Sequence, residues 1–227
     1  GDGSGKTVFF GPDARCAAGP AMRLESELDR KARSCREEWD RRHAGGDGPE
    51  APDPVLRDHA HLLPTSGCAL DLACGLGGNA LWLAKRGLEV SAWDISPVAI
   101  ERLRSSALTL GLTLDAVVRD VVADPPPAAR FDLIVVTHFL ERLLAPAIAS
   151  ALKPGGLLCY QTFVRESVST RGPGNPAYRL APNELLHLFP GLRVCVYRDE
   201  GRVGNPSLGL RDLALLIARR EAGFGPD

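Results

Sequence analysis

The chain has 227 residues, of which 44% are hydrophobic and 24% charged, and its formal net charge is −1. This length and hydrophobic content allow one substantial core, and the near-neutral charge gives no global attraction to nucleic acids or anionic membranes. No apolar run approaches the roughly 20 residues that span a bilayer, and a secretory signal is not recognisable, so we expect a cytoplasmic location and no membrane partner. The six cysteines lack the short paired spacings of zinc sites, which predicts reduced thiols and no metal site.

The N-terminal part of the chain differs in character from the rest. Met22 is the only methionine, and the Gly-rich segment before it has no helical or strand periodicity, so we expect residues 1–21 to lie outside the natural reading frame. A charged amphipathic helix is predicted from 22 to 43, followed by a Gly/Pro-rich connection through Pro54. The expected organisation is an extension (1–54), a main domain (55–220) and a tail (221–227).

The central part of the chain alternates apolar strands with helices. Strands are predicted near 67–73, 88–94, 114–120 and 131–136, and helices near 78–86, 96–110 and 140–152. This alternation favours parallel strands joined by helical crossovers, in a sheet covered on both faces, and therefore an α/β fold. The remaining elements are strands at 157–164, 192–199 and 210–218, a loop at 165–182 and a short helix at 183–188. That loop is too long for a simple connection, which is typical of functional or disordered segments.

A glycine-rich turn at residues 68–80 is the most informative stretch. A buried strand there ends in Asp71 and turns through Gly75 and Gly77 into a helix, which lets the backbone pass close to a ligand. Two further acids, Asp94 and Asp120, close the next two predicted strands. Because the carboxyl ends of parallel strands meet at one edge of a sheet, we expect all three acids to face one nucleoside-sized hollow.

The ordered set of motifs resembles class I S-adenosylmethionine-dependent methyltransferases over about 39–218. Besides the glycine turn and the strand ending in Asp94, the set includes residues 130–136 and the Leu-Lys-Pro-Gly-Gly run at 152–156. The resemblance implies a doubly wound, mostly parallel seven-stranded sheet, a Rossmann-like methyltransferase fold, with an antiparallel strand near the C-terminal edge. Residues 92–94 and the segment from Trp39 to His43 are similar to the tellurite-resistance and thiol or small-molecule methyltransferase branch.

The resemblance also assigns positions to the cofactor, S-adenosylmethionine. Asp71, Gly75 and Gly77 would surround its methionine portion. Asp94 would hold the ribose hydroxyls, and Asp120 with the Val121 N–H would meet the adenine. The implied cofactor-binding residues are Asp71, Ala73, Gly75, Gly77, Asn79, Asp94, Ile95, Asp120, Val121 and Thr137. Each acid has an alternative reading as a cap or an ordinary strand-end residue.

Three residues are candidates for handling the methyl acceptor. His138 follows the fourth strand, where a neutral imidazole could take a proton or orient the acceptor. Arg165 and Arg179 lie on the long loop, where guanidinium groups would suit an anionic acceptor. The alternatives are a His138 that only bonds a neighbouring loop, arginines that are merely solvated, and a loop that closes as a lid.

The expected function is transfer of a methyl group from S-adenosylmethionine to a small-molecule acceptor, for which a thiol or a metalloid species is a candidate. A soft anion of this kind needs no strong general base, whereas an amine or hydroxyl must lose a proton. The composition argues against a nucleic-acid partner, and no obligate protein partner is indicated. The alternatives are a nicotinamide-dependent oxidoreductase and a noncatalytic S-adenosylmethionine-binding regulatory module.

Overall fold

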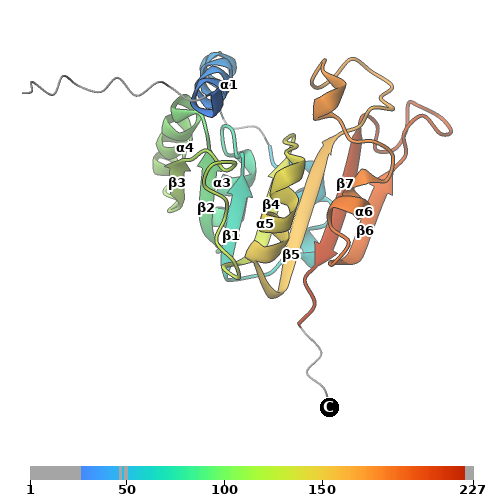
Figure 1. Cartoon of the computed structure of the whole chain (residues 1–227). Coiled ribbons are helices and arrows are strands. Elements are labelled where there is room, and N and C mark those ends of the chain that lie inside the picture. Colours follow the sequence, from blue (N-terminus) through green and yellow to red (C-terminus); the bar gives the residue numbers. More distant parts are fainter. Residues whose placement is uncertain (1–26, 46–47, 49–50, 223–227) are drawn as a thin grey trace, which may run out of the picture.

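The chain folds into a seven-stranded sheet with helices on both faces (Figure 1). The computed structural model describes residues 27–45, 48 and 51–222, so the expectations for residues 1–21 lie outside the described residues. The strands are β1 (Cys68–Leu72), β2 (Glu89–Asp94), β3 (Asp115–Val118), β4 (Phe131–Thr137), β5 (Leu152–Phe163), β6 (Arg193–Asp199) and β7 (Leu213–Arg219). Their order in space is β3-β2-β1-β4-β5-β7-β6.

Strand direction confirms the predicted fold class. β1 to β5 pair in parallel, and β7 runs antiparallel to both β5 and β6. The sheet is therefore mostly parallel and doubly wound, with its antiparallel part at the C-terminal edge, as expected. This arrangement brings the carboxyl ends of β1, β2, β4 and β5 to the same edge, where α/β proteins bind their ligands.

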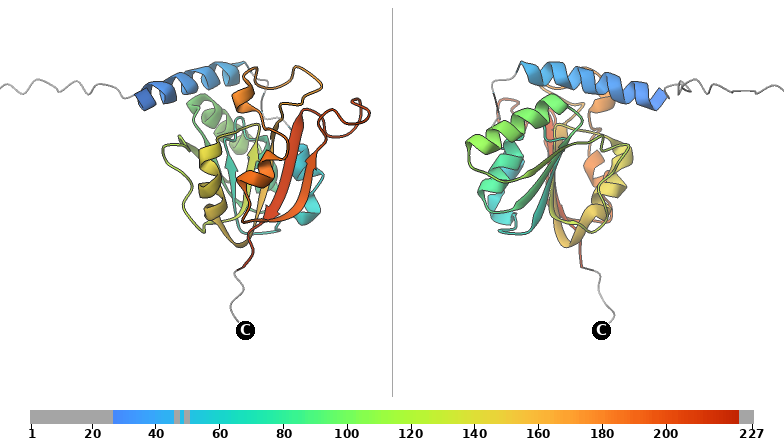
Figure 2. Two further views of the ribbon diagram at one scale, coloured as in Figure 1. Left: turned by 45° about the vertical axis from the view of Figure 1, so that its right-hand side comes forward. Right: turned by 90° about the vertical axis from the view of Figure 1, so that its left-hand side faces the viewer.

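Helices cover both faces of the sheet and cross its carboxyl edge (Figure 2). The α-helices are α1 (Glu27–Ala44), α2 (Pro54–Arg57), α3 (Gly78–Lys85), α4 (Pro97–Thr109), α5 (Ala145–Ala151) and α6 (Glu184–Leu188), with short 3-10 turns η1 (Ala60–Leu62), η2 (Arg142–Leu144) and η3 (Pro176–Tyr178). Helices α2, α3 and α4 pack on one face, and α5 and α6 on the other. Helix α1 lies beside α4 across the carboxyl edge (Figure 1).

Three elements differ from the predicted boundaries. The helix expected at 140–152 begins as the 3-10 turn η2 and becomes helical at Ala145, where Pro146 occupies the first turn and needs no hydrogen-bond partner for its nitrogen. The edge strand β3 ends at Val118, before Asp120. Residues 153–156 belong to β5, which starts at Leu152 and shifts its register opposite β4.

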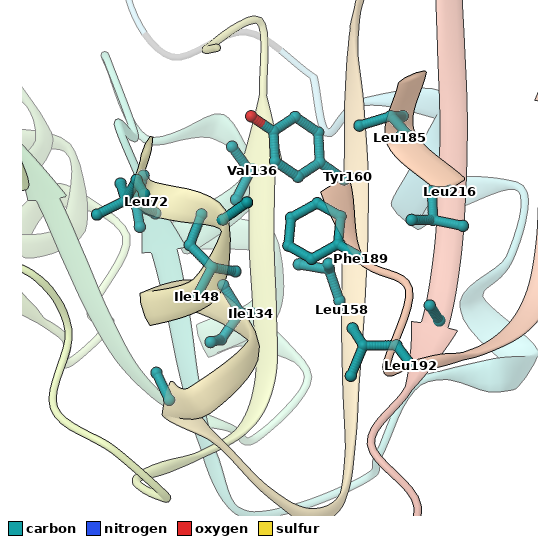
Figure 3. Close-up of a cluster of buried hydrophobic side chains, with 14 of the residues drawn as sticks. Leu72, Ile134, Val136, Ile148, Leu158, Tyr160, Leu185, Phe189, Leu192 and Leu216 are labelled. Carbon is teal, nitrogen blue, oxygen red and sulfur yellow. The ribbon is translucent and has the colours of Figure 1, made fainter. Parts of the chain in front are cut away.

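Both faces of the central strands are buried, which explains their nearly continuous apolar sequence. In β4, Ile134 and Val136 face the α5 side, whereas Leu133 and Val135 face the α3 and α4 side. Figure 3 shows the first of these layers, in which Ile148 of α5 lies against β4. The layer also contains Tyr160, whose hydroxyl donates to the backbone oxygen of Phe139 at 2.9 Å.

Two adjacent leucines of η2 test the contribution of this layer. Leu144 is 3% exposed within the core, whereas Leu143 is 88% exposed. We expect Leu144→Ala to lower the free energy of unfolding by about 2–5 kcal/mol, because it leaves a cavity. Leu143→Ala should change it by less than about 0.5 kcal/mol. Urea denaturation measures both, and equal effects would contradict the packing described.

Candidate active site

The turn between β1 and α3 is built by residues with left-handed backbone angles. Ala73, Gly75 and Gly77 have φ values of 56°, 51° and 79°. Glycine is favoured at 77, because its left-handed φ strains other residues and an added Cβ would also meet the Leu103 side chain of α4. The turn therefore packs closely against α4 at the carboxyl edge of the sheet.

Asp94 holds this turn from the end of β2. Its carboxylate accepts one hydrogen bond from the Gly75 N–H at 2.8 Å and another from the Ser96 N–H at 2.9 Å. Ser96 in turn caps α4 by accepting from the Ala99 N–H at 3.1 Å. Burial raises the pKa of Asp94, while the hydrogen bonds from Ser96 and Gly75 oppose that rise. One carboxylate thus joins the glycine turn to the first turn of α4.

Helix α1 covers the glycine turn and the start of α4. Asp40 accepts a hydrogen bond from the Ser96 hydroxyl, and the backbone oxygen of His43 accepts one from Arg102 of α4. The His43 ring lies over the glycine turn, since a Cβ added to Gly75 would sit 3.3 Å from its Cε1 atom. Burial lowers the pKa of His43 despite the nearby negative charge of Asp94, which favours a neutral imidazole at this position.

Asp71 lies beneath the turn and is only 1% exposed. One carboxylate oxygen accepts from the Ala80 N–H at 3.0 Å and so fixes the first turn of α3. The other, Oδ1, has no hydrogen-bond partner among the described residues. Burial, together with the negative charge of Asp53, raises the pKa of Asp71 from 3.8 to about 8.

Asp120 lies beyond the end of β3 and organises its own loop. Its Oδ1 atom accepts from the Val122 N–H at 3.0 Å and the Ala123 N–H at 3.3 Å. The neighbouring Val121 side chain is buried in the core. Asp71 thus lies within β1, Asp94 ends β2 and Asp120 follows β3, so the three acids come from three adjacent strands.

A cavity of about 550 Å³ lies beside the carboxyl ends of β4 and β5. It is lined by His138, Gln161, Arg171, Arg57, and parts of the 51–54 and 206–213 segments. His138 is 37% exposed on its side chain and has a positive φ of 57°. Its backbone N–H donates to the backbone oxygen of Gln161 at 2.9 Å, and its ring packs on Phe163 with centroids 5.2 Å apart.

A polar network connects the cavity to the glycine turn. Asp53 is its centre, because its carboxylate accepts from Asn79 Nδ2 at 3.1 Å and from Gln161 Nε2 at 3.3 Å. It also lies 3.7 Å from His138 Nε2. Asn79, in the first turn of α3, donates further to the Thr137 hydroxyl at 3.0 Å. Four residues of the predicted main domain, Asn79, Thr137, His138 and Gln161, are thus gathered around Asp53 of the predicted extension.

The two loop arginines do not join this network. Arg179 is 8% exposed and donates to the backbone oxygens of Pro173, Val164 and Arg171, so all of its described bonds hold the loop itself. Arg165 is exposed and donates to the Pro176 oxygen at 3.4 Å. These contacts favour structural roles over the catalytic roles expected from the sequence, whereas Arg171 is the loop arginine that lines the cavity.

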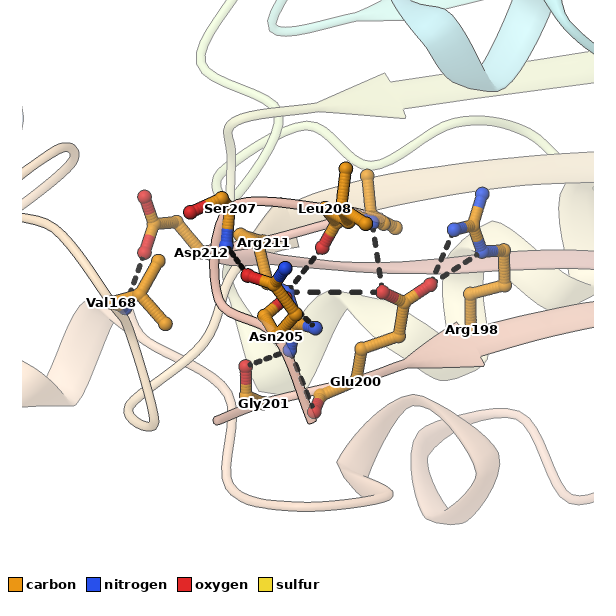
Figure 4. Close-up of polar contacts among 10 residues, drawn as sticks. Val168, Arg198, Glu200, Gly201, Asn205, Ser207, Leu208, Arg211 and Asp212 are labelled. Atoms are coloured by element: carbon orange, nitrogen blue, oxygen red, sulfur yellow. Dashed lines mark hydrogen bonds and ion pairs between the residues drawn. The ribbon is translucent and has the colours of Figure 1, made fainter. Parts of the chain in front are cut away.

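Asp212 and Arg211 line the cavity and hold the 165–182 and 200–212 loops in place (Figure 4). The Asp212 carboxylate accepts from the Val168 N–H at 2.6 Å and the Ser169 N–H at 3.0 Å, which anchors the 165–182 loop. Arg211 donates to backbone oxygens of the 200–212 loop, including that of Gly201 at 2.9 Å. These bonds hold the two loops that line this part of the cavity.

Sequence reasoning missed Asp53, and it noted Gln161 only as one of several polar residues beyond the fifth strand, without a role. An Asp-Pro pair before a helix indicates an N-cap, but the Asp53 side chain makes no cap bond with α2 and faces Gln161 instead, 108 positions away in the chain. Gln161 lies within β5, is 0% exposed, and its Oε1 atom has no partner among the described residues. Both residues depend on contacts between distant segments, for which no local pattern exists.

The site fits S-adenosylmethionine, whose sulfonium and ammonium groups carry positive charge. Asp53, Asp71 and Asp94 concentrate acceptor oxygens at this edge, and Asp71 Oδ1 is a buried acceptor with an unused lone pair. The described residues contain no group of three or more His, Cys, Asp or Glu side chains placed to hold a metal ion. No helix in the described ranges has the length and apolarity needed to cross a bilayer.

The buried Asp71 makes stability depend on pH. Between about pH 5 and 8 the folded state keeps a proton on Asp71 that the unfolded chain has lost, so the free energy of unfolding should fall as the pH rises. Asp71→Asn keeps an oxygen acceptor for the Ala80 N–H and removes the titration. We expect it to reduce this fall by more than about 1 kcal/mol in urea denaturation, relative to the exposed control Asp115→Asn. Identical slopes for both variants would contradict the buried, protonated Asp71.

Comparisons with known proteins agree with this geometry. Residues 69–156 match the family model described as a methyltransferase domain. A ubiquinone biosynthesis O-methyltransferase of Xanthomonas axonopodis pv. citri is 33% identical over 155 residues, 62% of each chain. The corresponding protein of Xylella fastidiosa is 34% identical over 155 residues, covering 62% of this chain and 60% of that one. The match therefore spans less than two thirds of either relative.

Solved structures share the fold. A protein studied in the conversion of a disulfide bond into a thioacetal group during echinomycin biosynthesis is 25% identical, with a TM-score of 0.63 over 82% of this chain and 92% of that one. TehB from Haemophilus influenzae is 23% identical, with a TM-score of 0.58 over 74% of this chain and 61% of that one. The chain therefore contains a methyltransferase domain, and its strand order and glycine turn are those of the Rossmann-like S-adenosylmethionine-dependent methyltransferase fold.

Proposed function

We propose that the protein transfers a methyl group from S-adenosylmethionine to a hydroxyl group of a small molecule held in the cavity beside His138. The observation that carries the proposal is the position of this cavity. One of its lining residues, Asp53, accepts a hydrogen bond from Asn79, which follows the glycine turn in the first turn of α3 and also bonds Thr137 at the end of β4. A donor at the turn and an acceptor in the cavity would therefore be neighbours, and alignment of two reactants supplies much of the acceleration in methyl transfer.

The residues of the turn suit the cofactor by charge. When bound, S-adenosylmethionine supplies a methyl group on a positively charged sulfur. Asp71 and Asp94 surround the turn with oxygen atoms that favour a cation, and Asp94 at the end of β2 occupies the place from which carboxylates hold ribose hydroxyls in related sheets. Gly75 and Gly77 leave the backbone open to close approach.

The cavity favours an acceptor that must lose a proton. A thiolate or reduced metalloid would need no base, but His138 lines the cavity with an acidic partner, Asp53, within 3.7 Å. Such a pair suits a hydroxyl, because its proton must leave as the oxygen attacks. The O-methyltransferase names of the relatives support the same choice. Arg57 and Arg171 at the cavity favour an acceptor that also carries negative charge.

Cofactor binding tests the first half of the proposal. We expect isothermal titration calorimetry to detect S-adenosylmethionine and S-adenosylhomocysteine but not NAD. Asp94→Ala should weaken S-adenosylhomocysteine at least about 10-fold, because it removes both a ribose partner and the clamp on Gly75. The same substitution at exposed Asp115 should leave the affinity unchanged. Binding of NAD alone would instead support an oxidoreductase.

An acceptor screen with labelled methyl donor tests the second half. It should include phenols and other hydroxylated acids, thiols, tellurite, selenite and small amines, and we expect label on hydroxyl compounds. His138→Gln should lower kcat by about 100-fold or more while cofactor affinity stays within about twofold. If only thiols or metalloids accept the label and His138→Gln remains fully active, the protein is a methyltransferase but the hydroxyl assignment is wrong.

A further inference from the structure

We infer that Asp53 is the positioning residue for His138, setting which ring nitrogen carries the proton and so making the other the base that the acceptor meets. This inference rests on the proposed function and extends it to a residue outside the matched methyltransferase domain. Asp53 precedes α2, in the segment that the sequence suggested was only an extension.

Asp53 is itself held firmly in place. Its backbone N–H donates to Asn79 Oδ1 at 2.9 Å, and Asn79 Nδ2 returns a bond to its carboxylate at 3.1 Å. Gln161 Nε2 reaches the other carboxylate oxygen at 3.3 Å from a fully buried position in β5. The carboxylate is therefore oriented from α3 and from the sheet, and the oxygen shared with Gln161 is also the one nearest His138.

His138 is constrained from its other side. Its backbone has a positive φ of 57°, which strains a non-glycine residue, and strained residues of this kind gather at functional sites. The hydrogen bond from the His138 N–H to the backbone oxygen of Gln161 and the packing on Phe163 hold that conformation. Its Nε2 atom faces Asp53, and in the described part of the chain no hydrogen bond uses Nδ1.

This geometry assigns the two ring nitrogens. The 3.7 Å between Asp53 and Nε2 is longer than a hydrogen bond, but the carboxylate is an acceptor only, and its negative charge at this distance favours the tautomer with hydrogen on Nε2, which leaves the lone pair on Nδ1. In the reaction the acceptor's O–H bond breaks, and its proton moves to Nδ1. The oxygen's electron pair forms the new O–C bond, and the pair of the breaking C–S bond returns to sulfur. The Asp53 carboxylate stabilises the imidazolium until solvent removes the proton.

Gln161 supplies an independent sign that a ligand belongs here. Its Oε1 atom is buried without a partner among the described residues, although the same side chain lines the cavity and donates to Asp53. An unpaired buried oxygen is costly unless something donates to it. A donor on the bound acceptor, close to His138, would satisfy that oxygen and hold the reacting hydroxyl beside the base.

Asp53→Asn is the sharpest test, because the amide keeps the shape but presents N–H donors. It can no longer favour hydrogen on His138 Nε2, so we expect the ¹⁵N shifts of the His138 ring in the cofactor-free protein to move toward the Nδ1–H tautomer. With an active hydroxyl acceptor, kcat should fall at least about 10-fold, while KM and the S-adenosylhomocysteine affinity stay within about twofold. Asp115→Asn is the matched control and should match wild type in all four measurements.

A double-mutant cycle separates positioning from a purely structural role. If Asp53 acts through His138, the Asp53→Asn substitution should cost no further activity in the His138→Gln background. Additive losses, or unchanged ring shifts in Asp53→Asn, would overturn the inference. The ring shifts need no methyl transfer, so they judge the Asp53 and His138 pair even if the proposed function fails. Conversely, an active Asp53→Asn enzyme with wild-type kcat would refute the pair and leave the methyltransferase function standing.

Discussion

The site depends on one carboxylate that serves two backbone segments at once. Asp94 accepts hydrogen bonds from the N–H of Gly75 in the β1–α3 turn and from that of Ser96 at the start of α4. The turn is also held by two backbone bonds, from the Gly77 N–H to the Cys74 oxygen at 2.9 Å and from the Cys74 N–H to the Trp93 oxygen at 3.0 Å. The same Ser96 bonds Asp40 of α1, so the clamp extends to the helix that covers the glycine turn.

Negative charge is concentrated at this edge, at a cost to the folded protein. Burial raises the pKa values of Asp71 and Asp94, which means that their ionised forms are disfavoured by their surroundings. A positively charged ligand offsets that cost, so the arrangement that weakens the free protein is the one that favours a sulfonium cofactor. Unpaired oxygens on Asp71 and Gln161 fit the same pattern of a site prepared for a ligand.

The fold alone does not choose the chemistry. A [4+2]-cyclase shares this architecture with a TM-score of 0.64 at 18% identity, so the reaction must be argued from the side chains at the site. In this chain those side chains come from both sides of the predicted domain boundary. The end of β4 is followed by His138, β5 supplies Gln161, and the segment before α2 supplies Asp53, so the predicted extension contributes to the cavity as well as covering the glycine turn with α1.

The alternation of apolar segments and the glycine spacing predicted the parallel strands and the glycine turn, because these are local signals that each segment carries by itself. The resemblance of the ordered motifs to methyltransferases added the seven-stranded sheet with its antiparallel edge. The sequence also identified Asp94 and His138 as strand-end residues. Only the tertiary structure decided that Asp53 meets His138, that Arg179 turns into its own loop, and that α1 crosses the carboxyl edge. The first and last of these contacts join segments tens of residues apart, and their geometry follows from how whole layers pack, which no short pattern of residues encodes.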